Sequence, residues 1–182
     1  RGVKVVTAFG FSTENWNRTQ REVSYLMRLL EQGILENIER FQRLKVRVRV
    51  IGQKERLPQS LQNAVKKVEE ETKENSELFL NLAISYGGRW DIVQAAKRLI
   101  EEKVPAENVT EELFESYLST AGLPEPDLFI RAGGEMRLSN LVLWQAAYTE
   151  LYFCSKYWPA FDEKDLDDAI KDFASRARRF GK

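Results

Sequence analysis

The sequence predicts an α/β fold, a central and mostly parallel sheet flanked by helices. Apolar runs of strand length alternate with amphipathic segments of helix length along the whole chain. This alternation is typical of crossover connections between parallel strands. A length of 182 residues also suits one domain with helices on both faces of a sheet. We therefore predict that residues 1–182 form a single domain.

The amino-acid composition excludes several classes of function. The chain has 28 basic and 28 acidic residues, so no net charge attracts nucleic acid, which we do not expect as a partner. Histidine is absent, which removes His-based acid–base chemistry and His-containing metal sites. Cys154 is the only cysteine, so an internal disulfide is excluded and a reducing cytoplasm is expected. The longest apolar runs are shorter than the roughly 18 residues of a membrane span.

Four segments are predicted as strands by their apolar content. The first, residues 3–9, is apolar on both faces, so it belongs inside a sheet with a neighbour on each side. Because the chain begins directly before this strand, we expect an N-terminal piece to be missing. The second, residues 45–51, alternates apolar and basic residues, and its cations are expected to form a solvated face that guards an edge. The remaining two are expected at 78–85 and 127–130.

Apolar residues three and four positions apart predict the helices. We expect them at 22–41, 59–74, from Asp91 onward, after a cap at Thr110, at 141–148 as a short buried helix, and at 165–178 after a cap at Asp162. The stripe on 22–41 is wide enough either to form core or to line a hydrophobic cavity, and periodicity does not separate the two. The inward face of the helix from Asp91 is expected to comprise Ile92, Val93, Ala96, Leu99 and Ile100.

Three strand ends carry unusual chemistry. Residues 10–22 form a polar loop that also contains Phe11 and Trp16. It is either a ligand-contacting loop or a capped helix start with Trp16 packed on the core. Glycine-rich turns with arginine follow the later strands at 86–91 and 131–140. Ligands bind α/β sheets beyond the carboxyl ends of the strands, so we expect the three segments to meet at one edge.

The turn at 131–140 is suited to an anion. Gly133 and Gly134 permit a close backbone approach, and Arg131 and Arg137 are forked cations that match phosphate oxygens. Ser139 and the N–H groups of a helix start would add neutral donors. In the alternative interpretation, both arginines pair with surface carboxylates.

A lone carboxylate and a basic tail complete the set of candidates. Glu150 lies among aromatic and aliphatic residues, so it needs a cation, a metal or a hydrogen-bond donor as partner. The segment 176–182 is basic, which either stabilises a helix C-terminus or serves binding.

Five motifs, in order along the chain, resemble those of cis-prenyltransferases, and within that family they are most similar to the bacterial undecaprenyl diphosphate synthases. They read FSTENWNR at 11–18, YGGRWD at 86–91, IRAGGEMRLSN at 130–140, WQAAYTELYF at 144–153 and RRFG at 178–181. The resemblance implies a homodimer whose subunits each surround a hydrophobic tunnel. It also implies magnesium-dependent, sequential addition of isopentenyl diphosphate to an allylic diphosphate such as farnesyl diphosphate. The product would be the polyprenyl carrier lipid of cell-wall peptidoglycan synthesis, which would bring the enzyme into contact with the inner face of the membrane.

The same resemblance implies roles for individual residues. Arg131, Arg137 and Ser139 would grip the diphosphate of isopentenyl diphosphate, and Glu150 would bind magnesium. A mobile loop that closes over the substrates and assists condensation would contain Ser12, Asn15, Trp16, Arg18 and Glu22. The tunnel wall would include Leu26, Leu29 and Leu30. The tail around Arg179 and Gly181 would complete the neighbouring subunit's site.

The chain also departs from the family pattern. The family begins with a strand and a glycine-rich loop bearing an essential Asp for magnesium and the allylic diphosphate, and this chain begins at what would be the second strand. Whether this chain alone is active therefore stays open. Smaller departures are Ala132, where Thr is usual, Thr19, where Pro is usual, and Met136, where some members have His, and we expect little effect from them.

Two competing interpretations remain at this point. The first is a non-catalytic relative that supports a catalytic partner, although such subunits tend to lose the diphosphate-gripping residues that are present here. The second is a nucleotide-binding α/β protein, which would need a phosphate loop such as G-x-G-x-x-G that this chain lacks.

Overall fold

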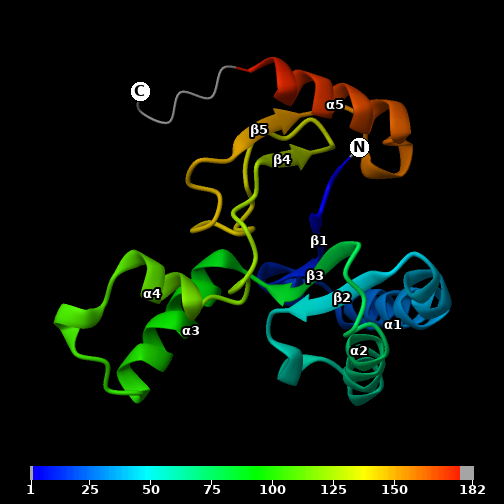
Figure 1. The fold of residues 1–182 in the computed structure, drawn as a ribbon. Helices are drawn as coiled ribbons and strands as arrows, with labels where there is room; N and C mark the ends of the chain where they lie inside the picture. The colour runs from blue at the N-terminus through cyan, green and yellow to red at the C-terminus, as the bar shows by residue number, and fades with distance from the viewer. Residues whose placement is uncertain (1, 177–182) are drawn as a thin grey trace. The chain divides into compact units, whose positions relative to one another are not determined.

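The computed structural model describes residues 2–176 and confirms an α/β fold with parallel strands flanked by helices. The chain divides into an N-terminal unit, Arg1–Pro124, and a C-terminal unit, Glu125–Lys182. Within the described residues the strands form two sheets, one in each unit, where a single central sheet was predicted (Figure 1). The prediction that residues 1–182 form one domain stays a prediction.

The N-terminal unit is built around a parallel sheet with the strand order β1-β3-β2. Its strands are β1 (Val5–Ser12), β2 (Val46–Ile51) and β3 (Leu78–Tyr86). Val6 lies opposite Leu80, and Val48 lies opposite the same residue from the other side. Among the described residues β1 pairs with β3 alone, and Val6 is 37% exposed, so the two neighbours expected for this strand are not both found.

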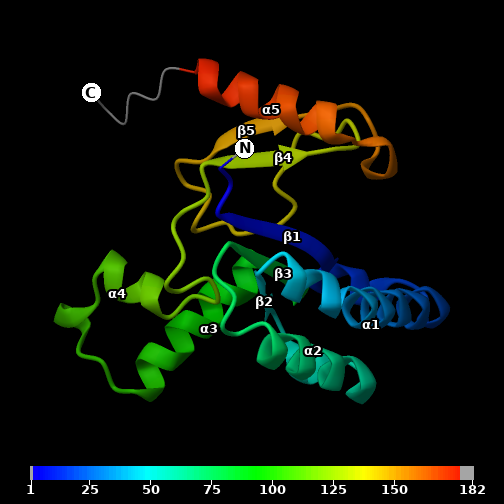
Figure 2. The same ribbon diagram turned by 45° about the vertical axis from the view of Figure 1, so that its right-hand side comes forward.

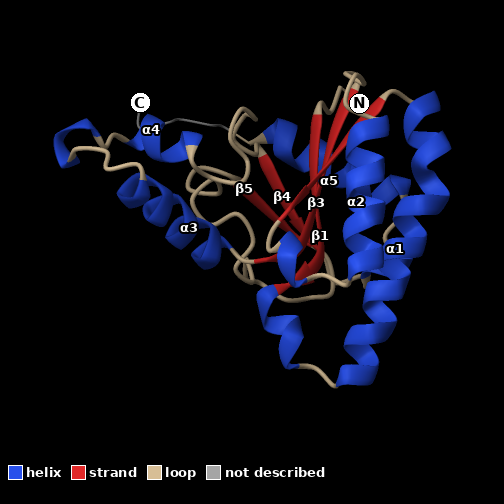
Figure 3. Ribbon diagram, turned by 90° about the horizontal axis from the view of Figure 1, so that it is seen from below, coloured by secondary structure: helices blue, strands red, loops and turns tan. Residues whose placement is uncertain are grey.

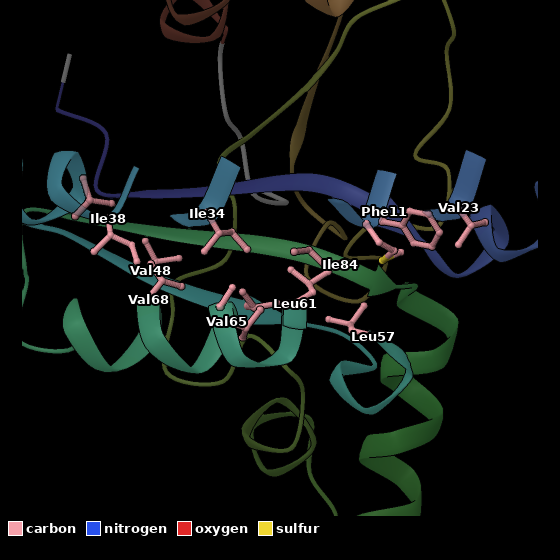
Figure 4. Packing of buried hydrophobic residues seen from close by; sticks show 14 residues of the cluster. Phe11, Val23, Ile34, Ile38, Val48, Leu57, Leu61, Val65, Val68 and Ile84 are labelled. Atoms are coloured by element: carbon pink, nitrogen blue, oxygen red, sulfur yellow. The ribbon is translucent and has the colours of Figure 1, made fainter. Parts of the chain in front are cut away.

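Two helices cover one face of this sheet. They are α1 (Gln20–Arg43) and α2 (Gln59–Glu71), which lie side by side along the strands (Figure 3). Their apolar stripes bury a cluster against β2 and β3, with Leu61, Val65 and Val68 of α2 facing Val48 and Ile84 (Figure 4). The helical periodicity in the sequence therefore predicted this core correctly, with helix bounds that agree to within three residues.

The opposite face of β2 confirms the edge position but not full solvation of its cations. Arg47 is exposed and lies over the ring of Phe79. Arg49 is half-buried and donates hydrogen bonds to the carbonyl oxygens of Ser119 (2.5 Å) and Ala121 (3.1 Å). Burial lowers the pKa of Arg49 from its ordinary value. This arginine therefore fastens the segment that contains Ser119 and Ala121 to the sheet.

Helix α3 (Gly88–Glu101) begins earlier than predicted, and two of its five predicted inward residues are exposed. Val93 is 49% exposed and Ile100 is 75% exposed, so their predicted inward positions are wrong. Residues seven positions apart share a helix face, which is why apolar spacing selected them. Leu99 is buried, as predicted, and the buried face also contains Asp91, which is held there by its hydrogen bonds to Ser119.

Short helices complete the N-terminal unit. Thr110 caps α4 (Glu111–Ser116), as predicted, by accepting a hydrogen bond from the backbone of Leu113. The 3-10 helices of this unit are η1 (Thr13–Asn17), η2 (Lys54–Arg56) and η3 (Ala106–Asn108).

The C-terminal unit contains a second parallel pair of strands and a helix. Strands β4 (Leu128–Arg131) and β5 (Glu150–Phe153) pair in parallel. Helix α5 (Glu163–Ser175) follows the 3-10 helix η4 (Trp158–Ala160) and packs against β5 (Figure 2). Asp162 caps α5, as predicted, and accepts hydrogen bonds from the backbone of Lys164 and Asp165.

The short buried helix predicted at 141–148 is not formed. These residues are bends and turns. Ser139, Asn140 and Val142 have φ angles of +50°, +64° and +40°, and L-residues in this left-handed region interrupt a right-handed helix. Leu141, Val142 and Ala146 are nevertheless buried, so the apolar pattern reported burial but not backbone conformation.

None of the helices within residues 2–176 combines the length and the apolarity that crossing a membrane requires.

We expect Leu61→Ala to lower the free energy of unfolding by about 2–5 kcal/mol, because this fully buried side chain would leave a cavity between α2 and the sheet. Chemical denaturation would measure the change. Leu35→Ala is the matched control, since Leu35 is 41% exposed on α1. Equal losses for the two variants would contradict the packing described here.

Candidate active site

The segment after β1 is folded by two consecutive capping boxes. Ser12 accepts a hydrogen bond from the backbone of Asn15 (3.2 Å), and the side-chain oxygen of Asn15 accepts one from the backbone of Ser12 (3.0 Å). Thr19 and Glu22 make the same exchange at the start of α1. Reciprocal caps satisfy the free N–H groups of a helix start. The capped helix start expected for residues 10–22 is thus present, and the contact of this segment with a ligand stays a prediction.

Trp16 connects this segment to the sheet. Its indole N–H donates a hydrogen bond to the hydroxyl of Ser85 (2.8 Å) at the end of β3. Its ring meets Phe11 edge to face at 5.0 Å between centroids, and the guanidinium of Arg56 lies 4.7 Å from the ring centroid. The side chain is half-buried and packs against the core, as the same interpretation expected.

Arg18 and Glu22 lie on the exposed side of the segment. The hydroxyl of Thr19 donates to the Glu22 carboxylate at 2.6 Å, and the Thr19 backbone donates at 3.1 Å. These two hydrogen bonds, the side-chain one foremost, lower the pKa of Glu22 below its usual range. Glu22 is therefore ionised at neutral pH and held at the N-terminus of α1.

The turn at 86–91 lies beside this segment, because Tyr86 is paired with Ser12 across the sheet. It contains a buried carboxylate that sequence reasoning did not single out. Asp91 is 1% exposed and accepts hydrogen bonds from Tyr86 Oη (3.0 Å) and from the backbone and hydroxyl of Ser119 (2.9 and 2.6 Å). Its partner Ser119 is 28 residues away, so sequence spacing carried no signal for the pairing.

In the C-terminal unit the turn after β4 brings two predicted residues together. The guanidinium of Arg131 donates a hydrogen bond to the hydroxyl of Ser139 at 3.0 Å. Gly133 and Gly134 have φ angles of +95° and +75° and donate backbone hydrogen bonds to the carbonyls of Lys156 (2.7 Å) and Cys154 (2.9 Å). The glycine turn is therefore held beside β5 by backbone hydrogen bonds. Arg131 provides a cation there, and Ser139 provides a neutral hydroxyl next to it.

Arg137 fits the alternative interpretation of this turn. It is exposed and forms an ion pair with Glu135. No helix begins at Ser139 and Asn140, so the N–H donors of a helix start, which the sequence suggested for an anion, are absent there. The anion-binding groups of this turn reduce to the two arginines and the Ser139 hydroxyl.

Glu150, the predicted magnesium ligand, has a cation as partner. Its carboxylate lies 2.7 Å from a guanidinium nitrogen of Arg176, which also pairs with Asp172 (2.5 Å). These hydrogen bonds, the one to Glu150 first, raise the pKa of Arg176. Among residues 2–176, no three acidic or cysteine side chains gather closely enough to hold a metal ion by themselves. Glu150 could therefore provide one oxygen of a magnesium site whose other ligands come from a substrate's phosphates and water, which is the mode that magnesium prefers.

The leucines of the predicted tunnel wall differ in environment. Leu26 and Leu30 pack against the core cluster, whereas Leu29 is 45% exposed. Arg179 and Gly181 lie outside the described residues. Of the three strand ends expected to meet, the structure brings together those at 10–22 and 86–91. The third, at 131–140, follows β4 in the C-terminal unit, and its meeting with the others stays a prediction.

Comparison with known proteins assigns this arrangement to a class. A family model described as "Putative undecaprenyl diphosphate synthase" matches residues 1–181. An isoprenyl transferase of Bacillus thuringiensis subsp. konkukian is 49% identical over 183 residues, which cover 98% of this chain and 71% of the relative. One of Neisseria meningitidis serogroup A is 47% identical over 181 residues, covering 100% of this chain and 72% of that protein.

Two solved structures share the fold. The lavandulyl diphosphate synthase from Lavandula x intermedia, solved with dimethylallyl diphosphate, has a TM-score of 0.95 and 39% identity, covering 100% of this chain and 80% of that one. A probable undecaprenyl diphosphate synthase from Campylobacter jejuni has a TM-score of 0.89 and 40% identity, covering 98% and 84%.

The fold and the relatives define a prenyl-transferring enzyme of the cis class. The chain belongs to the prenyltransferase family of the undecaprenyl diphosphate synthases. The alternative of a non-catalytic subunit is not favoured, since the relatives are named as transferases.

The cap formed by Glu22 should make stability depend on pH. Folding lowers the pKa of Glu22, so its contribution to stability is complete above the unfolded-state pKa, about 4.3, and is lost as the pH falls through the folded-state value. We expect Glu22→Gln to be less stable than the parent at pH 7, and the difference to shrink on acidification below about pH 4. Urea denaturation across this pH range measures it.

The matched control is Glu39→Gln, because this exposed glutamate of α1 is not part of the cap. A pH response of the same size for both variants would rule out the proposed role of the cap.

Proposed function

We propose that this enzyme adds isopentenyl diphosphate units sequentially, with cis geometry, to an allylic diphosphate such as farnesyl diphosphate. The product is a polyprenyl diphosphate of the undecaprenyl type. The observation that carries the proposal is the Arg131–Ser139 pair on the glycine turn after β4, at 3.0 Å, in a chain of this family. The dimethylallyl diphosphate bound to the lavandulyl diphosphate synthase is an allylic diphosphate of the same chemical kind.

Arg131, Arg137 and Ser139 provide the grip on the isopentenyl diphosphate. A guanidinium presents donors in a fixed fork that matches two phosphate oxygens, and hydrogen bonds between opposite charges are the strong ones. The Arg131 guanidinium is already oriented by Ser139. Arg137 is exposed and joins by exchanging Glu135 for a phosphate oxygen, a small loss because exposed ion pairs contribute little.

Magnesium supplies charge neutralisation for the departing diphosphate when it is bound. Glu150 is the residue of this chain that would hold the magnesium ion. The ion would either displace Arg176 from the Glu150 carboxylate or share that carboxylate with Arg176.

The residues after β1 have a different task. Asn15, Trp16, Arg18 and Glu22, with Ser12, form the segment that closes over the substrates, orients them and excludes water, which provides the proximity contribution to the rate.

The growing prenyl chain requires an apolar channel. We assign its wall to Leu26, Leu29 and Leu30 of α1, where Leu29 exposes an apolar side chain beside two leucines that pack on the core. We further propose a homodimer in the cytoplasm. Its lipid product would bring it to the inner face of the membrane and into cell-wall peptidoglycan synthesis.

The proposed function predicts magnesium-dependent incorporation of labelled isopentenyl diphosphate into polyprenyl product with farnesyl diphosphate as primer, measured with the full-length natural protein. We expect Arg131→Gln to raise the KM for isopentenyl diphosphate by about 10- to 100-fold, since hydrogen bonds to charged groups contribute about 1.5–3 kcal/mol each. Lys171→Gln is the control, because this side chain of α5 is 78% exposed. No incorporation by the parent protein would refute the function, and an unchanged KM in Arg131→Gln would refute this binding site.

Glu150→Gln keeps the shape of the side chain and removes the charge that a metal needs. We expect the magnesium concentration for half-maximal rate to rise by about tenfold or more, the size typical of losing support for a metal site. The matched variant is Asp172→Asn, which removes the other carboxylate of Arg176 but not the proposed ligand. If Asp172→Asn produced the same shift, the effect would belong to Arg176 and not to a metal ligand.

A further inference from the structure

Trp16 lies in a seat built from the ends of all three strands of the N-terminal sheet. We use the term indole seat for Phe11, Arg56 and Ser85. Phe11 belongs to β1, Arg56 to the 3-10 helix that follows β2, and Ser85 to β3. The seat provides an aromatic edge, a stacked guanidinium and a hydrogen-bond acceptor at 2.8 Å. A buried indole N–H needs an acceptor, but burial alone would not require the stacked guanidinium.

Ser85 is fixed in an unusual conformation. Its φ angle is +53° and the residue is fully buried. Its carbonyl accepts a hydrogen bond from the backbone of Gln53 at 3.0 Å. Gly52 approaches so closely that a Cβ there would lie 2.1 Å from the carbonyl oxygen of Ile84. A non-glycine residue with positive φ persists only where its surroundings determine it, and such residues concentrate at functional sites.

Arg56 closes the seat from the side of β2. One guanidinium nitrogen donates to the side-chain oxygen of Gln53 at 3.1 Å, and Gln53 is 8% exposed. This hydrogen bond orients the guanidinium over the indole ring, where a cation is attracted to the face of tryptophan. Gln53 therefore links both halves of the seat, since its backbone holds Ser85 and its side chain holds Arg56.

The seat determines where the segment after β1 lies. The capping hydrogen bonds of Ser12 with Asn15 and of Thr19 with Glu22 join residues three apart, so they shape the segment and hold it only to the end of its own strand, β1. The hydrogen bond from Trp16 to Ser85 spans 69 positions. Because Trp16 and Asn15 belong to the same 3-10 helix, the position of the Ser85 hydroxyl determines where Asn15 lies.

We propose that Ser85 and Arg56 are positioning residues of the prenyl transfer reaction, acting through Trp16. The inference rests on the proposed function, because its consequence is a change in the rate of condensation. Weakening the seat shifts the segment that bears Asn15 and Arg18, and small displacements of positioning groups reduce rates strongly. Isopentenyl diphosphate binding, assigned to the turn after β4, is left unchanged.

The decisive variant is Ser85→Gly in the full-length natural protein. Glycine adopts a φ of +53° without strain, so the variant removes the hydroxyl and keeps the fold. We expect kcat to fall about tenfold, with the KM for isopentenyl diphosphate within about twofold of the parent and no loss in Tm. The indole N–H proton of Trp16 should exchange faster with solvent, which nitrogen-15 NMR measures. Its signal is assigned by its loss in Trp16→Phe.

A second variant tests the other side of the seat. Arg56→Gln should also lower kcat, and its matched control is Arg47→Gln, which removes a guanidinium stacked on Phe79 elsewhere on the sheet. Since both positioning residues act through the indole, Ser85→Gly added to Trp16→Phe should lower kcat no further than Trp16→Phe alone.

Unchanged exchange of the Trp16 indole N–H, or unchanged kcat, in Ser85→Gly overturns the inference. Additive losses in the double variant do so as well, because Ser85 would then act independently of Trp16. A parent protein that incorporates no isopentenyl diphosphate overturns the proposed function and the positioning role with it, even where the indole loses protection. The two failures are therefore distinguishable.

Discussion

The parallel pairing of β3 with both β1 and β2 is the constraint from which the N-terminal unit follows. Strands that run in one direction end at one edge, so the segments after all three must share limited space there. Gly52 shows how tightly they meet, because a side chain at that position would collide with the carbonyl of Ile84. The crowding fixes Ser85 in its left-handed conformation, and Ser85 in turn receives Trp16. The backbone conformation of Ser85 thus determines the position of Trp16, which lies 69 residues earlier in the chain.

Most of this framework could be predicted from the sequence, since it depends on periodic burial. The stripes of α1 and α2 and the alternation in β2 each follow from one element packing on one face. Where burial and periodicity separate, prediction failed. In α3 the buried face also contains the carboxylate of Asp91, and Val93 and Ile100 are exposed despite their spacing. At 141–148 the apolar residues are buried, but positive φ angles at Ser139, Asn140 and Val142 exclude a helix.

The candidate site was less predictable, because its chemistry depends on pairs of side chains from separate segments. Residue types identified Arg131 and Ser139, which lie eight positions apart within one turn. They also showed that Glu150 needed a partner, but not that Arg176, 26 residues further on, would provide it. The hydrogen bonds of Trp16 with Ser85 and of Asp91 with Ser119 likewise arise only when the chain is folded. Sequence patterns indicate that a polar group needs a hydrogen-bond or charge partner, whereas the tertiary structure determines which residue is that partner.

Under the proposed function, the partners of Arg131, Arg137 and Arg176 indicate how readily each part of the site can receive a diphosphate and magnesium. Arg131 rests on a neutral hydroxyl, so an anion can approach its guanidinium without displacing a carboxylate. Arg137 must release Glu135, a pair that is exposed on both sides and therefore weak. The side chains of Glu150 and Arg176 are each 30% exposed, and the distance between their carboxylate oxygen and guanidinium nitrogen is 2.7 Å. Arg176 also has Asp172 as a second partner. If Glu150 held magnesium, as proposed, Arg176 would still be paired with Asp172. Under the proposed function, Arg131 is therefore the group most accessible to an anion, Arg137 has a weak ion pair to exchange, and Glu150 has the better-buried ion pair of the two.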